Sequence, residues 1–507
     1  MKKVYISIAS LLLCGSMLMA QSPANRTSKT IVADVLAQMP AEQQAEYNKL
    51  INDLSSTGEE GVLMLINKIN APGKGSNSNV DYALSGLTHY VMAKGEENAR
   101  LATANAYLKA LDKVSDRETK AFIIRQLQLL GKDECVDTLA SYLNDENLSG
   151  PAARALSAIR TDNAKKVLVA SLMRRSGTPK TQKDIIRAIA DVQIADAENV
   201  LKAMLGSSDE NMQKEVLYAL SRVGSKASLS DLAAVAEKAG YKMEKTGANE
   251  AYIALIKRVL EQGDTKDAEK AANDLLKKST KAGMTQTREA ALQILLAAKP
   301  EAATKNLLSA LKDTDKGYRN AALNFASGFA DQNVYIEVMK HMLKAKPEVK
   351  VDILNWIGRE SKCPSKHDMI KNLELRFDLP AKQVLLEQLK DKNFDVQQAA
   401  VWALVKIGDK SVIPVLADLL KSNDKQVILL GQDALMAFNG DIDQAVAKVI
   451  PSASDAGKIA GLELLAIRMA DANLNTVLDQ IKSGSSEVKK AAYTALKDVV
   501  SLSLIHI

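Results

Sequence analysis

Residues 394–424 read FDVQQAAVWALVKIGDKSVIPVLADLLKSND, and this stretch predicts two helices joined by a tight turn. The first helix is expected over about residues 395–407, where apolar side chains recur at the three- and four-residue spacing of one buried stripe. The same spacing predicts a second helix over about 411–421. Gly408 is a typical residue just after a helix, and Pro414 is tolerated in a first turn because its missing N–H has no partner there. The stretch therefore predicts an antiparallel helix pair.

The same pattern returns along the chain at intervals of about 30 to 31 residues. The pair at the centre of the first helix recurs as Ala403-Leu404, Ala434-Leu435, Leu464-Leu465 and Ala495-Leu496. Small alanines let the two helices of a unit approach closely, and larger apolar residues fill the space between units. Because one unit cannot bury both of its faces alone, neighbouring units must stack. The sequence predicts an all-α fold, a right-handed α-solenoid of helix–turn–helix repeats.

Residues 395–420, DVQQAAVWALVKIGDKSVIPVLADLL, resemble a HEAT repeat of the short kind also found in phycobilisome-lyase-like proteins. The resemblance is strongest over 116–240 and 285–500. It implies HEAT-like repeats over 116–392 and regular HEAT repeats over 393–501, the last of which lacks its second helix.

Three segments depart from the repeat. Residues 21–115 are predicted to form an irregular N-terminal helical region, in which NAPGKGSNSN (70–79) is a flexible connector. The segment SKCPSKHDMIKNLELRFDLPAK (361–382) is expected to distort one unit. Further structure is expected to be missing at the carboxyl end, where the helix at 486–499 should be followed by a second one. Instead LSLIHI (502–507) matches the translation of a transposon-end sequencing adapter, so the natural protein is expected to continue after about residue 500.

The amino-terminal residues 1–20 have a charged start, an apolar stretch and a small residue before a polar segment, which together predict a secretory signal peptide cleaved after Ala20. Cys14 offers an alternative as a lipid-attachment site. Ordinary cleavage is favoured, because Leu13 precedes that cysteine and the apolar stretch continues beyond it. No later segment approaches the ~20 apolar residues of a membrane span. The leader therefore predicts export, and the second resemblance described below implies the periplasm, the cell surface or the extracellular space of a Gram-negative bacterium as the location.

Two cysteines follow the leader, Cys135 and Cys363. In a solenoid they would lie several repeats apart, which is far beyond the ~7 Å reach of a disulfide. We therefore expect two unpaired and mostly buried thiols.

Residues that could carry chemistry are few. The histidines are His89, His341, His367 and His506, and no His-Glu pair occurs. Cys363, His367 and Asp368 could in principle bind a metal, but a single cluster without a second ligand pair favours a solvated loop. The sequence therefore predicts no catalytic, cofactor-binding or metal-binding residue and no cofactor.

The net charge and the positions of the aromatic residues limit the classes of partner that the protein is expected to bind. A formal charge of +6 over 507 residues, with Lys2 and Lys3 in the leader, argues against nucleic acid as a partner. Two basic clusters are interpreted as cations at helix carboxyl ends, with a basic rim for an acidic partner as the alternative. They comprise Arg174, Arg175, Lys180 and Lys183, and Lys277, Lys278 and Lys281. Trp356 and Trp402 are expected in the core, which disfavours a sugar-binding platform.

The leading functional prediction is an exported scaffold without catalysis that binds a protein partner on a concave face lined by the second helices. The alternative comes from a second resemblance. The order of segments such as TIVADVLAQMPAEQQ (30–44), VDYALSGLTHYV (80–91) and GPAARALSAI (150–159) is similar to that in exported Gram-negative proteins. In those proteins the array precedes domains related to 3-keto-disaccharide hydrolases. That resemblance implies an accessory half of a truncated secreted enzyme, with any glycan bound only through the missing domain.

Overall fold

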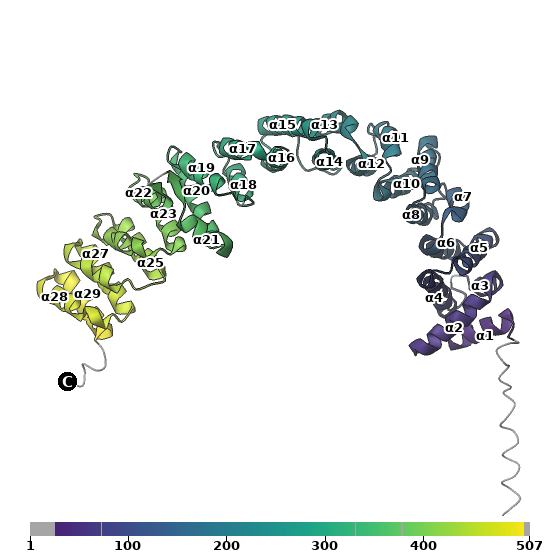
Figure 1. Ribbon diagram of the computed structural model, residues 1–507, viewed down its shortest axis with the longest axis horizontal. Helices are drawn as coiled ribbons and strands as arrows, with labels where there is room; N and C mark the ends of the chain where they lie inside the picture. Colours follow the sequence, from purple (N-terminus) through teal and green to yellow (C-terminus); the bar gives the residue numbers. More distant parts are fainter. Residues whose placement is uncertain (1–25, 72, 330, 377–378, 501–507) are drawn as a thin grey trace, which may run out of the picture. The chain divides into compact units, whose positions relative to one another are not determined.

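The computed structural model describes residues 26–71, 73–329, 331–376 and 379–500. The predicted leader with Cys14 and the six residues from Leu502 lie outside this part. The chain divides into two compact units, Met1–Asp264 (unit 1) and Thr265–Ile507 (unit 2), and the described residues of both are overwhelmingly helical (Figure 1). The predicted all-α solenoid is confirmed.

Unit 1 runs through the purple-to-teal part of the chain (Figure 1). Its α-helices are α1 (Ser28–Gln38), α2 (Gln44–Ser56), α3 (Gly58–Ile66), α4 (Ser78–Lys94), α5 (Glu97–Lys113), α6 (Arg117–Leu130), α7 (Val136–Ser141), α8 (Ser149–Ile159), α9 (Asp162–Arg174), α10 (Pro179–Val192), α11 (Glu198–Lys202), α12 (Glu210–Val223), α13 (Leu229–Lys238) and α14 (Ala248–Glu261). Short 3₁₀ helices precede three of them, η2 (Asp133–Cys135), η3 (Ala195–Ala197) and η4 (Lys226–Ser228).

Unit 2 has the same character. Its α-helices are α15 (Thr265–Lys281), α16 (Thr285–Ala298), α17 (Ala303–Ala310), α18 (Lys316–Ala326), α19 (Gln332–Met342), α20 (Pro347–Glu360), α21 (Pro364–Lys371), α22 (Ala381–Gln388), α23 (Phe394–Ile407), α24 (Ile413–Asp418), α25 (Lys425–Ala437), α26 (Asp443–Val449), α27 (Asp455–Ile467), α28 (Leu474–Ser483) and α29 (Ser486–Val499). Its 3₁₀ helices are η5 (Pro300–Ala302), η6 (Lys410–Val412), η7 (Leu419–Lys421), η8 (Ile450–Ser452) and η9 (Asp471–Asn473).

Each unit stacks its helices in two layers. The helices that open each repeat, here called the first helices, pack on one another in order: α6, α8, α10, α12 and α14 in unit 1, and α16, α18, α20, α23, α25, α27 and α29 in unit 2. The helices that close each repeat, the second helices, cover them from the other side: α7, α9, α11 and α13 in unit 1, and α17, α19, α22, α24, α26 and α28 in unit 2. Figure 1 shows these two layers in unit 1, where α8, α10 and α12 follow one side and α9, α11 and α13 the other.

Capping residues start many of the first helices. A side chain of Asp, Asn, Ser or Thr just before the helix accepts a hydrogen bond from a backbone N–H of its first turn, which satisfies a group left unpaired by the helix itself. These residues are Asp116, Thr178, Asp209, Asp315, Asn393, Asp424, Ser454 and Ser485. Each cap contributes about 1 kcal/mol. The caps therefore fix where one repeat ends and the next begins.

A long polar side chain at the fourth position of several first helices ties the helix to the turn before it. The side-chain nitrogens of these residues donate to backbone carbonyls in that turn: Gln182 to Arg175 at 3.4 Å, Gln213 to Leu205 at 3.3 Å, Arg319 to Asp313 at 2.9 Å and Gln397 to Asp391 at 2.6 Å. These carbonyls follow the preceding second helix, where backbone acceptors lack helical partners. The recurring donor thus connects consecutive repeats.

The unit quoted from the sequence folds as a helix pair with one difference. Its first helix, α23, begins one residue before the expected start and ends at Ile407, and Gly408 follows with a φ of 70° in the left-handed region. The second helix is divided into η6, α24 and η7 instead of one continuous α-helix. Pro414 accounts for the break at the start, because it has no N–H to bond back to Lys410.

The segment expected to distort a unit carries an insertion. Between α20 and α22 the chain forms α21 and a short antiparallel pair of strands, β1 (Glu374–Arg376) and β2 (Leu379–Pro380). This pair is the only β-structure in the part of the chain that is described.

The core is aliphatic, with one aromatic centre in unit 2. Trp356 is 1% exposed, stacks on Tyr335 with ring centroids 4.8 Å apart, and donates its indole N–H to the Ser327 hydroxyl at 2.9 Å. The prediction for Trp356 is confirmed. Trp402 is only partly buried, so its predicted place in the core is wrong in part. Across the described ranges, every helix is too short or too polar to cross a bilayer.

Candidate protein-binding grooves

A groove of about 590 Å³ runs over the first helices α12 and α14 of unit 1, next to the carboxyl end of α10. It is lined by Gln193, Lys214, Tyr218, Ser221, Arg222, Thr246, Gly247, Glu250, Ala251, Ala254, Lys257, Arg258 and Glu261. Helical spacing explains the set, because residues three and four apart share one helix face. Ala251 and Ala254 contribute only methyl groups to the α14 side of the lining.

Two arginines occupy matching places on successive first helices. Arg222, in the last turn of α12, donates its Nε–H to the Ala190 carbonyl at 3.1 Å. Arg258, in the last turn of α14, donates its Nε–H to the Gly224 carbonyl at 3.1 Å and its Nη1–H to the Gln193 amide oxygen at 3.1 Å. Both backbone acceptors lie at the carboxyl end of the neighbouring first helix. Each guanidinium is therefore anchored to the end of the neighbouring first helix.

An aromatic ring completes this groove. Tyr218 is 45% exposed although it is a large side chain on a packed helix. The Arg222 guanidinium lies over its ring, 5.7 Å from the centroid. The pair combines an apolar surface with a cation, which suits recognition of a partner chain.

A second groove, of about 660 Å³, lies over α18, α20 and α23 in unit 2. Arg319 and Asp352 form an ion pair on its floor, with the Arg319 Nε–H donating to the carboxylate at 2.7 Å, and they are 3% and 6% exposed. Trp402 lines this groove, which explains why that ring is only partly buried. The rest of the lining is Lys316, Pro347, Glu348, Val351, Asn355, Asn393, Asp395, Gln398 and Ala399.

Both grooves lie on the first helices, in contrast to the expectation that second helices line the binding face. The second helices are short and often begin or end in 3₁₀ turns, as α24 does between η6 and η7. The first helices are longer and pack on one another without such breaks. The longer continuous surface is therefore on the first-helix side.

The predicted basic clusters are only partly at helix carboxyl ends. Arg174 ends α9 and Arg175 caps it in a left-handed conformation, and Lys278 and Lys281 lie in the last turn of α15. Lys180 and Lys183 instead belong to the beginning of α10, where a cation opposes the helix dipole. Lys180 is stabilised there by Asp184, at 3.3 Å.

The histidines and cysteines take structural positions. His89 and His367 donate from Nδ1 to the carbonyls of Ser85 and Ser361, at 2.7 and 2.9 Å, while partial burial lowers the pKa of His341. Within the described ranges, no three His, Cys, Asp or Glu side chains gather as metal ligands. Cys135 and Cys363 are both free thiols, as expected, but only Cys135 is fully buried. His506 lies outside the described residues.

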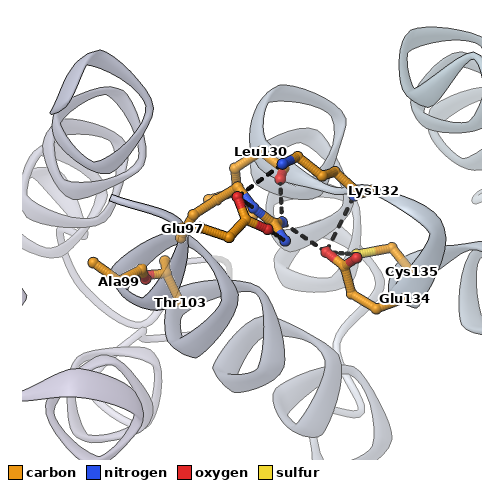
Figure 2. Close-up of polar contacts among 8 residues, drawn as sticks. Glu97, Ala99, Thr103, Leu130, Lys132, Glu134 and Cys135 are labelled. Carbon is orange, nitrogen blue, oxygen red and sulfur yellow. Dashed lines mark hydrogen bonds and ion pairs between the residues drawn. The ribbon is translucent and has the colours of Figure 1, made fainter. Parts of the chain in front are cut away.

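A polar network around one buried arginine joins the end of the region expected to be irregular (21–115) to the turn after α6. Figure 2 shows Glu97, Lys132 and Glu134 converging between α5 and the turn after α6. At their centre Arg100 is 4% exposed and donates to Glu97 at 2.7 Å, to Glu134 at 2.6 Å and to the Leu130 carbonyl at 2.8 Å. The hydrogen bonds that Glu97 accepts from Arg100 and from Lys132 hold the pKa of its carboxyl down to about 2. Four of the five guanidinium N–H groups of Arg100 donate to acceptors within the fold, so the network stabilises it.

The comparisons with known proteins support the repeat type. Residues 169–253 and 359–436 match the family of HEAT repeats. The chain is thus an α-solenoid that contains HEAT repeats. No curated protein matches it by sequence. The predicted link to proteins with 3-keto-disaccharide hydrolase domains stays a prediction.

Similar solved structures are large α-solenoids. Kap121p bound to Nup53p is 12% identical with a TM-score of 0.46, over 93% of this chain and 56% of that one. The Kap95:Nup1 complex is 12% identical with a TM-score of 0.41, over 93% and 73%. Importin beta in an ammonium sulfate condition is 13% identical with a TM-score of 0.37, over 92% and 72%. This chain spans 56% and 62% of the first two Kap121p structures, and likeness at this level supports no inference about partners.

Sequence reasoning missed Tyr218, Arg222 and Arg258. A signal was available, because "SRV" (221–223) and "KRV" (257–259) place an arginine at the same point of two consecutive units. The repeat pattern was defined by its buried alanine and leucine positions alone, which do not include these arginines. Exposed positions of the same register would have revealed the pair.

Proposed function

We propose that the protein is an exported, non-enzymatic scaffold that holds a protein partner against its first-helix face. The observation that carries the proposal is the groove over α12 and α14, which is lined by the exposed Tyr218 ring and two anchored arginines. Aromatic and arginine side chains are enriched where proteins bind one another, because they offer large contact area with few rotamers to order. The unit 2 groove, with Trp402 in its lining, is a second surface of the same type.

Site-specific photo-crosslinking in cells of the source organism tests this proposal. A photoreactive phenylalanine analogue replaces Ala254, which is exposed on α14 inside the groove, or Ala234, which is exposed on the second helix α13. Both sites are exposed alanines of unit 1, so they differ mainly in whether they lie on a first helix or on a second helix. We expect a discrete crosslinked protein from position 254 and none from position 234. Equal crosslinking, or none from either, would contradict a first-helix binding face.

We further propose export, with the leader removed after Ala20. The support is the charged, apolar and small-residue order of residues 1–20. Amino-terminal sequencing of the protein from the envelope and medium fractions should give Gln21 as the first residue. A protein that keeps Met1 and stays in the cytoplasmic fraction would refute this.

A further inference from the structure

We infer that the groove in unit 1, lined by Tyr218, Arg222 and Arg258, binds an acidic, extended peptide segment with carboxylates three residues apart. The inference rests on the proposed scaffold function and adds the chemical class of the partner. It follows from the charge, the anchoring and the spacing of the two arginines.

The unit 1 groove contains cations that form no ion pair among the described residues. Arg222, Arg258 and Lys214 have no carboxylate within ion-pair distance in the part of the chain that is described. Elsewhere the buried arginines are neutralised inside the fold, as Arg100 is by Glu97 and Arg319 by Asp352. Glu250 and Glu261 also line the groove, but neither pairs with these three cations. The groove lining therefore carries a net positive charge, with four cations (Lys214, Arg222, Lys257 and Arg258) against two carboxylates.

The two arginines of the groove are already anchored by hydrogen bonds to the backbone. The Nε–H of each arginine is used on a carbonyl, at 3.1 Å in both cases. Both terminal nitrogens of Arg222 and Nη2 of Arg258 have no partner within the described ranges. A guanidinium that is already ordered loses little side-chain entropy on binding, and its N–H pairs match a carboxylate. An acidic side chain would thus complete each site.

Spacing defines the partner's shape. The axes of neighbouring packed helices lie about 8–10 Å apart. Arg222 and Arg258 lie in the last turns of the successive first helices α12 and α14, so we take the spacing of the two carboxylate sites to be of this order. In a polyproline II segment, residues three apart return to the same side after about 9 Å. In a β-strand, residues three apart point to opposite faces, and residues two apart share a face but are only about 6.8 Å apart. The arginine pair therefore fits carboxylates at i and i+3 of a polyproline II segment, and Tyr218 offers the aromatic surface on which such segments pack.

Fluorescence anisotropy with the full chain and labelled peptides tests the inference. The probe is Glu-Pro-Pro-Glu-Pro-Pro-Glu. Its controls are the peptide with Gln in place of each Glu, and a peptide of the same composition with the three Glu adjacent. We expect the probe to bind at least about tenfold more tightly than either control, with affinity that falls as salt rises.

Variants locate the binding. The double variant Arg222→Gln/Arg258→Gln should lose about tenfold or more in affinity for the probe. Arg174→Gln removes a charge from the second helix α9 and should change affinity less than twofold. Thermal unfolding of each variant checks that the fold is retained, and Arg222→Lys/Arg258→Lys provides a milder change that keeps the charge but loses the paired N–H geometry.

Several results would overturn the inference: no binding of the probe, equal binding of a control peptide, no effect of the double variant, or equally tight binding of a labelled oligothymidylate. The last would indicate a general polyanion surface. A crosslinked partner at position 254 together with any of these results would leave the scaffold proposal standing and refute only the acidic segment. Absence of the crosslink, with tight probe binding, would refute the scaffold proposal alone.

Discussion

At the scale of single residues, Cys135 and Cys363 have opposite environments. Burial, with the nearby Glu134 charge as a smaller cause, raises the pKa of the Cys135 thiol to about 12. The Cys363 pKa is lowered, chiefly by the Ser365 hydroxyl, whose oxygen is 3.2 Å from the sulfur, and this thiol is partly exposed. The thiolate is the species that reacts with alkylating reagents.

We predict that iodoacetamide at pH 8 modifies Cys363 in the native protein while Cys135 stays intact. A pKa raised by three units lowers the thiolate fraction of Cys135 by roughly 1,000-fold before its burial is counted. Peptide mapping by mass spectrometry over a time course measures both sites, and in denaturant the two should react at similar rates. Comparable native rates would mean that Cys135 is not buried as described.

The Glu97 carboxyl makes a contribution to the stability of the fold that depends on pH. Its pKa is lowered from 4.5 to about 2, with the Arg100 hydrogen bonds as the largest cause and Lys132 second. A carboxyl with a lowered folded-state pKa stabilises the fold above its unfolded pKa and loses that contribution as pH falls through the folded value. The contribution is therefore present at neutral pH and disappears between about pH 4.5 and pH 2.

We predict that Glu97→Gln lowers the Tm at pH 7 and that the gap from the unmodified protein shrinks steadily from pH 4.5 to pH 2. Scanning calorimetry across this range measures the gap. Asp162→Asn, at an 89% exposed side chain paired only with Lys165, serves as the control and should change Tm little at any pH. A gap that is constant with pH would show that Glu97 acts through something other than its charge.

At the scale of helices, the approach of α27 to η7 depends on one glycine. A Cβ built on Gly457 would lie 1.8 Å from the Leu420 carbonyl oxygen, which belongs to the preceding repeat. That contact is with backbone, so it cannot be relieved by a rotamer change. The helices must then separate.

We predict that Gly457→Ala lowers the free energy of unfolding by about 2 kcal/mol, within the range for overpacked cores. Gly440→Ala is the matched control in the same unit, since its Cβ would meet atoms no nearer than 3.6 Å and should cost less than about 0.5 kcal/mol. Urea unfolding followed by circular dichroism measures both. Equal effects would contradict close packing of α27 on η7.

The same elements explain how far the sequence could predict the fold. First helices such as α23 were predicted to within a residue, because the buried Ala403-Leu404 pair and the left-handed Gly408 are local signals. The division of the second helix into 3₁₀ and α segments was not, since it depends on Pro414 and on packing between layers. The grooves were missed for a related reason. Whether an exposed position lies in a hollow depends on how far neighbouring helices separate, and residues such as Ala254 and Trp402 show no local sign of it.

At the scale of the whole molecule, each repeat contacts mainly the repeats beside it. First helices pack on the first helices before and after them within a unit, so stability is close to a sum of repeat and neighbour terms. A local defect in such an array raises the population of locally open states near itself, and this effect decays over a few repeats. This makes the array different from a single globular core, in which one defect destabilises everything.

We predict that Gly457→Ala speeds amide hydrogen exchange in α24 to α27 of unit 2 and leaves exchange in α10 to α14 of unit 1 unchanged. Exchange followed by mass spectrometry resolves the two regions in one sample, and Gly440→Ala again provides the reference. Because the acidic-peptide groove lies in unit 1, binding of the probe peptide by Gly457→Ala should also match the unmodified protein. Faster exchange throughout both units would mean that the chain unfolds as one cooperative body, and the nearest-neighbour account of its stability would then be wrong.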